Sequence, residues 1–182
     1  MTSKLNAMMV PRTVLRLMSG LLMIGLAACG TTVSEDSPEL DPSRTLYVMP
    51  FSNQSNMPMA QSQVEELVAS VLSSQGLTVR VYPKSRISDV RASLEPDLRQ
   101  EEARAWLAQQ SSGYVVQGAV HEWQYKFGID GEPAVGLTLV ISELNQNELW
   151  RGSASRSGWG RESITRIGIK AIEDITEEIN WR

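Results

Sequence analysis

The sequence predicts an α+β fold, a two-layer sandwich in which helices cover one face of a mostly antiparallel sheet. Three observations support this prediction. Three strand-like runs between residues 114 and 157 are separated by two turn clusters, the pattern of an antiparallel meander. Two stretches, 59–75 and 161–180, repeat apolar residues at helical spacing. Shorter strands and helices alternate ahead of the meander, so the expected order is β, α, β, α, β, β, β, α.

The first 28 residues have the features of a signal peptide. Lys4, Arg12 and Arg16 make its start basic, and the apolar run over 17–26 is too short to span a membrane comfortably as a helix. The run ends in Leu-Ala-Ala-Cys, the pattern at which bacterial lipoproteins are cleaved and acylated. We therefore predict that Cys29 carries acyl chains such as palmitate. Cys29 is the only cysteine, so no internal disulfide can form.

Lipidation predicts a protein that is anchored to a membrane without spanning it. One acyl chain binds weakly, so stable anchoring needs several chains, as bacterial lipoproteins have. Gly30 stands where an aspartate would signal retention in the inner membrane, which favours the outer membrane with the protein facing the periplasm. Residues 29–43 are polar and acidic with two prolines, and we expect a flexible tether there. Residues 44–182 are then a single periplasmic domain.

The mature chain is acidic. The signal peptide holds three of the 17 basic residues and none of the 21 acidic ones, which leaves a net charge of about −7 on the rest. Such a protein is a poor match for nucleic acid or anionic lipid headgroups, and a better match for a cationic partner. Ordinary solubility would explain the same charge, so both interpretations stay open.

The strands and helices ahead of the meander are predicted from the spacing of apolar residues and from the positions of Gly and Pro. A strand is expected over 45–51 and a helix over 59–75, which Gly76 ends. A second strand over 77–82 is followed by a helix that opens at Pro96 and runs to about residue 110. Residues 86–95 are too weakly patterned to assign.

The meander strands are expected over 114–126, 135–144 and 149–157, and a helix with an isoleucine-rich stripe over 161–180 follows them. One layer of helices leaves the other sheet face bare, so we expect subunit packing to cover it. One alternating face of the first meander strand carries Trp123, Tyr125, Phe127 and Ile129. Whether the remaining tryptophans lie in the core or at an interface stays open for Trp106, Trp150 and Trp181.

Residues suited to catalysis or metal binding are sparse. His121 is the only histidine, and a strand histidine beside Trp123 is more often packed than catalytic. Asp130 and Glu132 supply two carboxylates where calcium takes six or more oxygens. The stretch GSASRSGWG lacks the lysine of a phosphate-binding loop. We therefore expect a protein that is not an enzyme and binds neither metal nor cofactor.

Two exposed features remain. Asp130 and Glu132 flank Gly131 at the first turn of the meander, where carboxylates are ordinarily just solvated. On a ring of subunits these turns would converge and attract a cationic polymer. Trp159 lies between two glycines, with Arg156 and Arg161 nearby, and suits either the cap of a core or contact with lipid headgroups.

The stretch HEWQYKFGIDGEPAVGLTLVI, followed by LWRGSASRSGW, resembles the PelC family, the outer-membrane lipoproteins of the Pel exopolysaccharide secretion machinery. The layout also resembles periplasmic domains of the TolB N-terminal and CsgG type. The PelC resemblance implies a dodecameric ring whose electronegative funnel guides a partly cationic polysaccharide to a PelB-like β-barrel exporter. It implies that Asp130, with Glu132 beside it, lines the funnel and that Trp159, with Arg156 and Arg161, faces the membrane.

Two other functions stay open on the residues alone. The chain could be a generic envelope lipoprotein, monomeric or dimeric, that scaffolds or activates a periplasmic enzyme and whose acidic turn has no role. A hydrolase dependent on His121 is the more distant alternative. Subunit number and polymer chemistry follow only from the resemblance, and the surface that joins subunits is not predicted.

Overall fold

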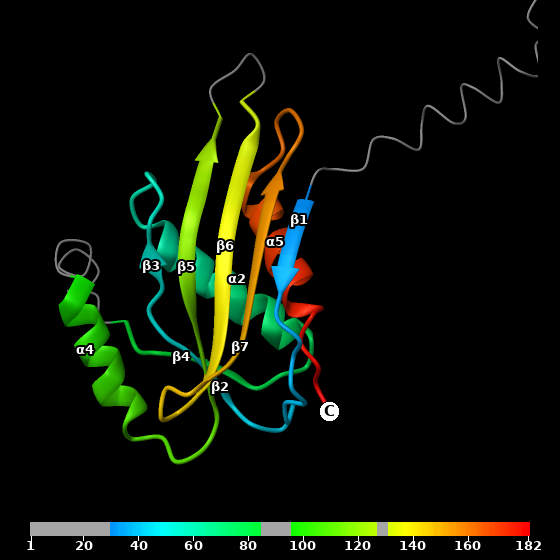
Figure 1. Ribbon diagram of the computed structural model, residues 1–182. Coiled ribbons are helices and arrows are strands. Elements are labelled where there is room, and N and C mark those ends of the chain that lie inside the picture. The colour runs from blue at the N-terminus through cyan, green and yellow to red at the C-terminus, as the bar shows by residue number, and fades with distance from the viewer. Residues whose placement is uncertain (1–29, 85–95, 127–130) are drawn as a thin grey trace, which may run out of the picture.

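The computed structural model describes residues 30–84, 96–126 and 131–182, and these form a mixed seven-stranded sheet with three helices (Figure 1). The α+β prediction is therefore confirmed. The sheet order is β1-β7-β6-β5-β2-β4, and β3 pairs with β5 beyond the end of β2. The elements in chain order are β1 (Gly30–Ser34), β2 (Leu46–Val48), β3 (Ser52–Asn53), α2 (Ala60–Ser74), β4 (Val79–Val81), α4 (Pro96–Leu107), β5 (Tyr114–Tyr125), β6 (Pro133–Glu143), β7 (Glu148–Ser157) and α5 (Ile164–Thr176).

The antiparallel meander β5–β6–β7 forms the larger half of the sheet. Its central strand β6 is buried along almost its whole length, and β5 carries a bulge between Val120 and Glu122. On the far side of β5, strands β2 and β4 run parallel to it. The meander forms as predicted because β-branched and aromatic residues alternate along its strands and the turn residues interrupt them.

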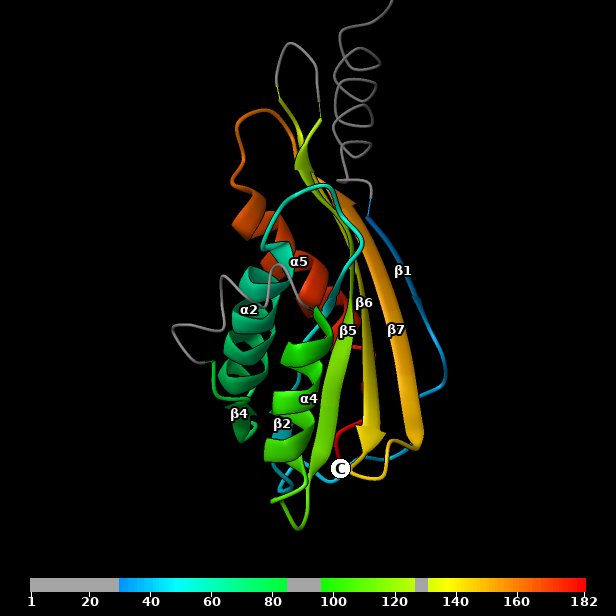
Figure 2. The ribbon, with the colours of Figure 1, turned by 90° about the vertical axis from the view of Figure 1, so that its left-hand side faces the viewer.

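Helices α2 and α5 pack on one face of this sheet and enclose the main core (Figure 2). The alternate residues of β6 that face them are Val135, Leu137, Leu139 and Ile141. Trp150 of β7 is fully buried in the same core, which answers the open question for that tryptophan. Trp181 packs partly buried against its edge.

Helix α4 lies on the opposite face of the sheet. This differs from the sequence prediction, in which helices cover only one face. It packs on Tyr47, Met49 and Val115, the residues that alternate with the main-core residues of β2 and β5. Trp106 of α4 meets Tyr47 edge to face, with ring centroids 5.5 Å apart. The reason is handedness. The crossover from β2 to β4 contains α2, and the crossover from β4 back past β2 to β5 contains α4. The two crossovers run in opposite directions along the sheet. Because both are right-handed, their helices lie on opposite faces.

The segment predicted as a flexible tether is instead part of the fold. Residues 30–34 form the edge strand β1, which pairs with β7 over five residue pairs. Further along, Leu40 is only 2% exposed and bridges to Trp181. The sequence prediction was wrong for this stretch because it judged the segment by its own composition, whereas β7 supplies a free strand edge that pairs with it.

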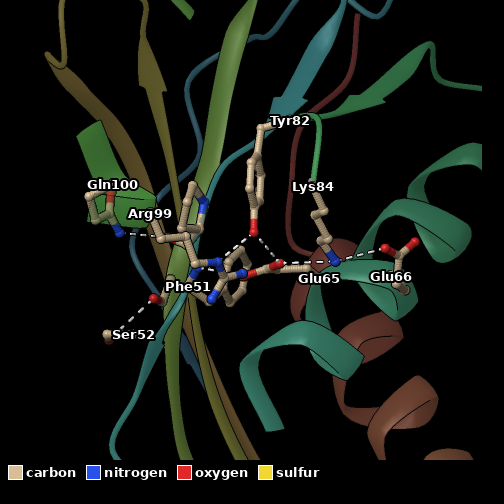
Figure 3. A network of polar contacts seen from close by, with 10 residues as sticks. Phe51, Ser52, Glu65, Glu66, Tyr82, Lys84, Arg99 and Gln100 are labelled. Carbon is tan, nitrogen blue, oxygen red and sulfur yellow. Dashed lines mark hydrogen bonds and ion pairs between the residues drawn. The ribbon is translucent and has the colours of Figure 1, made fainter. Parts of the chain in front are cut away.

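A buried ionic network joins the two helix layers at the sheet edge (Figure 3). Glu65 of α2 is completely buried, yet it lies on the core-facing side of the helix. It forms an ion pair with Arg99 of α4 and a second, 3.2 Å long, with Lys84. It also accepts hydrogen bonds from the backbone N–H of Phe51 (2.8 Å) and from the Tyr82 hydroxyl (3.3 Å). Burial and the Glu65 charge raise the pKa of Tyr82, so this hydroxyl stays a donor.

Candidate functional site at one end of the sheet

Three features that the sequence singles out lie at one end of the sheet. Strand register places Gly30 level with Arg156, Arg156 level with Val135, and Val135 level with Trp123. The loop after β7 extends beyond this level, at the top of Figure 1, and the last pair of β5 and β6, Tyr125 with Pro133, lies two residues beyond it. The start of β1, the Trp159 loop and the β5–β6 hairpin therefore lie at the same end of the strands.

The acidic turn is closed by a hydrogen bond of 2.7 Å from the backbone N–H of Lys126 to the carbonyl of Glu132. Gly131 has φ +57°, a left-handed conformation that glycine adopts without strain. Glu132 is half-buried on the described side of the turn. Asp130 lies outside the described residues, as do Phe127 and Ile129, so the predicted pairing of two carboxylates stays a prediction.

Trp159 is held outward by a loop that is fixed at three points. The backbone N–H of Gly158 donates to the carbonyl of Pro133 (2.7 Å), and the backbone N–H of Trp159 donates to the Glu162 carboxylate (2.9 Å). The backbone N–H of Ile164 donates to the hydroxyl of Tyr125 (3.1 Å). The indole itself is 79% exposed. Such a fixed, exposed tryptophan suits contact with another surface better than the capping of a core.

The two arginines near Trp159 have different surroundings. Arg156 projects from β7 toward α5 and forms a two-point ion pair with Asp174, with one contact at 2.9 Å. This bond raises the pKa of Arg156. Arg161 lies in the exposed part of the loop. Of the two, Arg161 is therefore the better placed to meet phosphate groups.

Comparison with solved structures relates the chain to one family in particular. A PelC dodecamer from Paraburkholderia phytofirmans superposes with a TM-score of 0.71 at 28% identity, over 85% of this chain and 100% of the PelC chain. A second PelC dodecamer structure from that organism gives a TM-score of 0.69, also at 28% identity, over 85% and 99% of the two chains. The chain is PelC-like.

The fold also occurs in lipoprotein GNA1162 from Neisseria meningitidis, with a TM-score of 0.52, 18% identity, and coverage of 74% of this chain and 96% of that one. At that identity the likeness concerns the fold alone. No protein-family model and no curated protein sequence matches the chain.

In this PelC-like fold, His121 belongs to a row of polar side chains on the sheet face away from α2 and α5. Its Nδ1 lies 2.9 Å from the Gln54 amide oxygen, and its Nε2 lies 2.8 Å from the Thr138 hydroxyl. Thr138 in turn lies 2.8 Å from the hydroxyl of Ser153. Among the described residues, both ring nitrogens thus meet neutral partners. A triad would place a carboxylate on one nitrogen and the nucleophile on the other.

Other site types have little support in the described part of this PelC-like chain. No group of three or more histidine, cysteine, aspartate or glutamate residues is arranged there to hold a metal ion. Within the same ranges, no helix has the length and apolar character needed to cross a membrane. Cys29 lies outside the described residues, so its predicted lipidation stays a prediction.

Proposed function

We propose that this chain is the PelC-type component of an exopolysaccharide secretion system, a lipoprotein that assembles into a ring and guides a cationic polymer to a β-barrel exporter. The observation that carries the proposal is the match to the PelC dodecamers, which spans the whole of the PelC chain at 28% identity. In this proposal the dodecamer is a closed ring of identical subunits, which repeats one contact between two different surfaces.

The charge of the chain supports this use. A net charge of about −7 on the mature protein favours a cationic partner, and twelve copies in one ring would sum their fields. The carboxylates proposed to act on the polymer are Asp130 and Glu132 at the β5–β6 turn. They bind no fixed ligand and act by concentrating positive charge along the lumen, as rings of carboxylates do in cation channels.

The proposed location is the periplasmic face of the outer membrane. Acylated Cys29 supplies the anchor, and the exposed indole of Trp159 enters the headgroup region with Arg161 beside it. The partners are then the exporter, the polymer, the lipid surface and further copies of the chain. Bond-making chemistry is no part of the proposed role.

The test is deletion of the gene from its bacterium, followed by complementation with variants and measurement of the exported polysaccharide. The wild-type chain should restore export, whereas the double variant Asp130→Asn/Glu132→Gln should leave export at or near the deletion level while the protein is made in normal amounts. Glu148→Gln removes a carboxylate from the start of β7, at the other end of the sheet, and should restore export fully.

Full export with both turn carboxylates removed would contradict the funnel role. Unchanged polysaccharide export in the deletion strain would contradict the secretion function altogether. That second result would favour the alternative of an envelope scaffold that serves a periplasmic enzyme.

A further inference from the structure

The bulge in β5 brings two polar side chains together on the sheet face away from α2 and α5. Val120 and Trp123, the residues on either side of the bulge, both point into the main core. His121 and Glu122 between them therefore share the opposite face, where a regular strand would place only one residue. Both lie beside Gly136 of β6, since a Cβ atom there would be 3.5 Å from Glu122 Cβ and 3.7 Å from His121 Cβ. The bulge thus directs an imidazole and a carboxylate toward a position that has no side chain.

Gly136 forms part of the lining of a hollow in this face. The hollow has a volume of ≈ 360 Å³, and small-molecule sites have volumes of about 300–1,000 Å³. Hydroxyl-bearing residues of β6, β7 and β1 line it, among them Thr138 and Ser153. Among the described residues around it, Glu122 is the one carboxylate, and no lysine or arginine takes part. The hollow is therefore polar, with a single acidic group.

A row of hydrogen bonds decides which polar atoms the hollow offers. The Gln54 amide oxygen accepts from His121 Nδ1 (2.9 Å), so Nδ1 carries the ring proton and Nε2 is an acceptor. The Thr138 hydroxyl then donates to Nε2 (2.8 Å), and its oxygen accepts from the Ser153 hydroxyl (2.8 Å). Both hydroxyl protons are thereby used, so Ser153 offers lone pairs to a ligand.

Glu122 adds a second acceptor at the same hollow. Its Oε1 accepts from the Gln124 side-chain amide (3.1 Å), which orients the carboxylate. Its Oε2 has no partner in the part of the chain that the structure describes. A ligand that fits must therefore bring hydrogen-bond donors. An ammonium group is the donor that also matches the charge, and hydrogen bonds between charged groups are roughly twice as strong as those between neutral groups.

We propose that this hollow binds one amino-sugar unit of a polysaccharide, with the ammonium group at Glu122 and a sugar hydroxyl donating to Ser153. A lysine side chain would bring its ammonium group on an apolar stem and leave the Ser153 acceptor without a donor. The inference rests on the proposed export function for the source of the polymer. It differs from the role proposed for the β5–β6 turn, because the hollow holds one sugar unit in place whereas the turn concentrates charge.

The experiment is isothermal titration calorimetry of the acylated chain in detergent micelles at physiological ionic strength, which screens weak attraction between exposed charges. The probes are the tetramer of glucosamine, which carries an ammonium group on every unit, and the uncharged tetramer of N-acetylglucosamine. We expect the wild type to bind the glucosamine tetramer roughly tenfold more tightly. The variant Asp130→Asn/Glu132→Gln should keep this preference, which separates the hollow from the turn carboxylates.

Two variants locate the binding in the hollow. Glu122→Gln keeps the shape and removes the charge, so the preference for the glucosamine tetramer should disappear. Gly136→Val fills the hollow and should bind neither tetramer. A Cβ atom at Gly136 would meet its neighbours at 3.5 Å or more, so we expect the fold to tolerate this change, as checked by urea unfolding. The matched control, Glu178→Gln, removes an exposed carboxylate from the turn after α5 and should bind like the wild type.

Three results would overturn the proposal. These are equal affinity of the wild type for the two tetramers, undiminished binding by a folded Gly136→Val variant, and unchanged preference in Glu122→Gln. Tighter binding of tetralysine than of the glucosamine tetramer would contradict the sugar and assign the hollow to a cationic peptide. Calorimetry needs no exporter, so its failure is separate from a failure of the proposed function, which the deletion strain reports.

Discussion

Glu65 is the one acidic side chain among the described residues that is completely buried, and its partners come from three parts of the chain. Phe51 precedes β3, Lys84 and Tyr82 follow β4, and Arg99 belongs to α4. Taking a charge out of water is costly unless it is paired and hydrogen-bonded. Each partner therefore fixes one segment relative to α2, and loss of one partner leaves the buried charge of Glu65 less fully compensated.

Removing both Glu65 and Arg99 should cost less than the sum of the two single removals. We expect Arg99→Met to lower the free energy of unfolding by about 3–5 kcal/mol. The double variant Glu65→Leu/Arg99→Met should lose clearly less than the sum of the single changes, because the buried carboxylate and its guanidinium partner are removed together. Urea unfolding of the two single variants and the double variant measures the coupling. Additive losses would mean that Glu65 and Arg99 do not act as a pair.

A second ion pair makes stability depend on pH. The hydrogen bond from Arg44 holds the pKa of Glu143 below its ordinary value of 4.5, and the shortest contact between the two is 2.9 Å. Because the folded-state pKa is the lower one, the pair stabilises the fold at neutral pH, and this contribution is lost as the pH falls below about 4.5.

The matching variant is Glu143→Gln, which keeps the other contacts of Arg44. We expect it to be less stable than the wild type at neutral pH by under ~1 kcal/mol, since the pair is partly exposed. The difference should vanish in acid, as measured by urea unfolding at both pH values. A gap of the same size below the folded-state pKa would contradict the assignment.

At the level of elements, the sequence predicted those whose own pattern is strong. The meander and α5 repeat apolar residues at the periods of a strand and a helix, so they could be placed before any contact was known. β1 could not be placed, because Gly-Thr-Thr-Val-Ser has no such pattern and becomes a strand only beside the free edge of β7. The side of α4 could not be predicted either, because it depends on the parallel order of β4, β2 and β5.

Helix α5 approaches the sheet closely at Gly168, and this contact gives a prediction. A Cβ atom on Gly168 would lie 2.7 Å from Cζ3 of the buried Trp123 ring and closer still to Cη2. Alanine gains about 1 kcal/mol of helix propensity over glycine, whereas overpacking a core typically costs 1–3 kcal/mol. We expect Gly168→Ala to destabilise the protein by roughly 1–2 kcal/mol in urea unfolding.

The control for this prediction is the smaller ring of Trp123→Phe. In that background, Gly168→Ala should be neutral or stabilising, because the alanine methyl group fills the space that the indole leaves. Destabilisation of equal size in both backgrounds would mean that the cost does not come from the contact with Trp123.

For the whole molecule, part of the candidate site followed from sequence and part needed the fold. The glycines around Trp159 predicted its loop, and the structure places the indole outside the core. The pairing of Arg156 with Asp174 was not visible, because it joins β7 to α5 through the sheet register. The sequence also did not predict that Gly30, the Trp159 loop and the β5–β6 hairpin lie at the same end of the sheet, because this arrangement comes from three successive strand pairings.

The claim that the chain acts as a PelC-type ring is tested most directly by the mass of the assembled protein. Native mass spectrometry of the acylated chain in detergent, with light scattering across a range of concentrations, measures it. We predict a single closed oligomer of the size of the solved PelC dodecamers, with a mass that does not grow with concentration. A protein that stays monomeric at high concentration, with its anchor present, would contradict the ring and the converging carboxylates that depend on it.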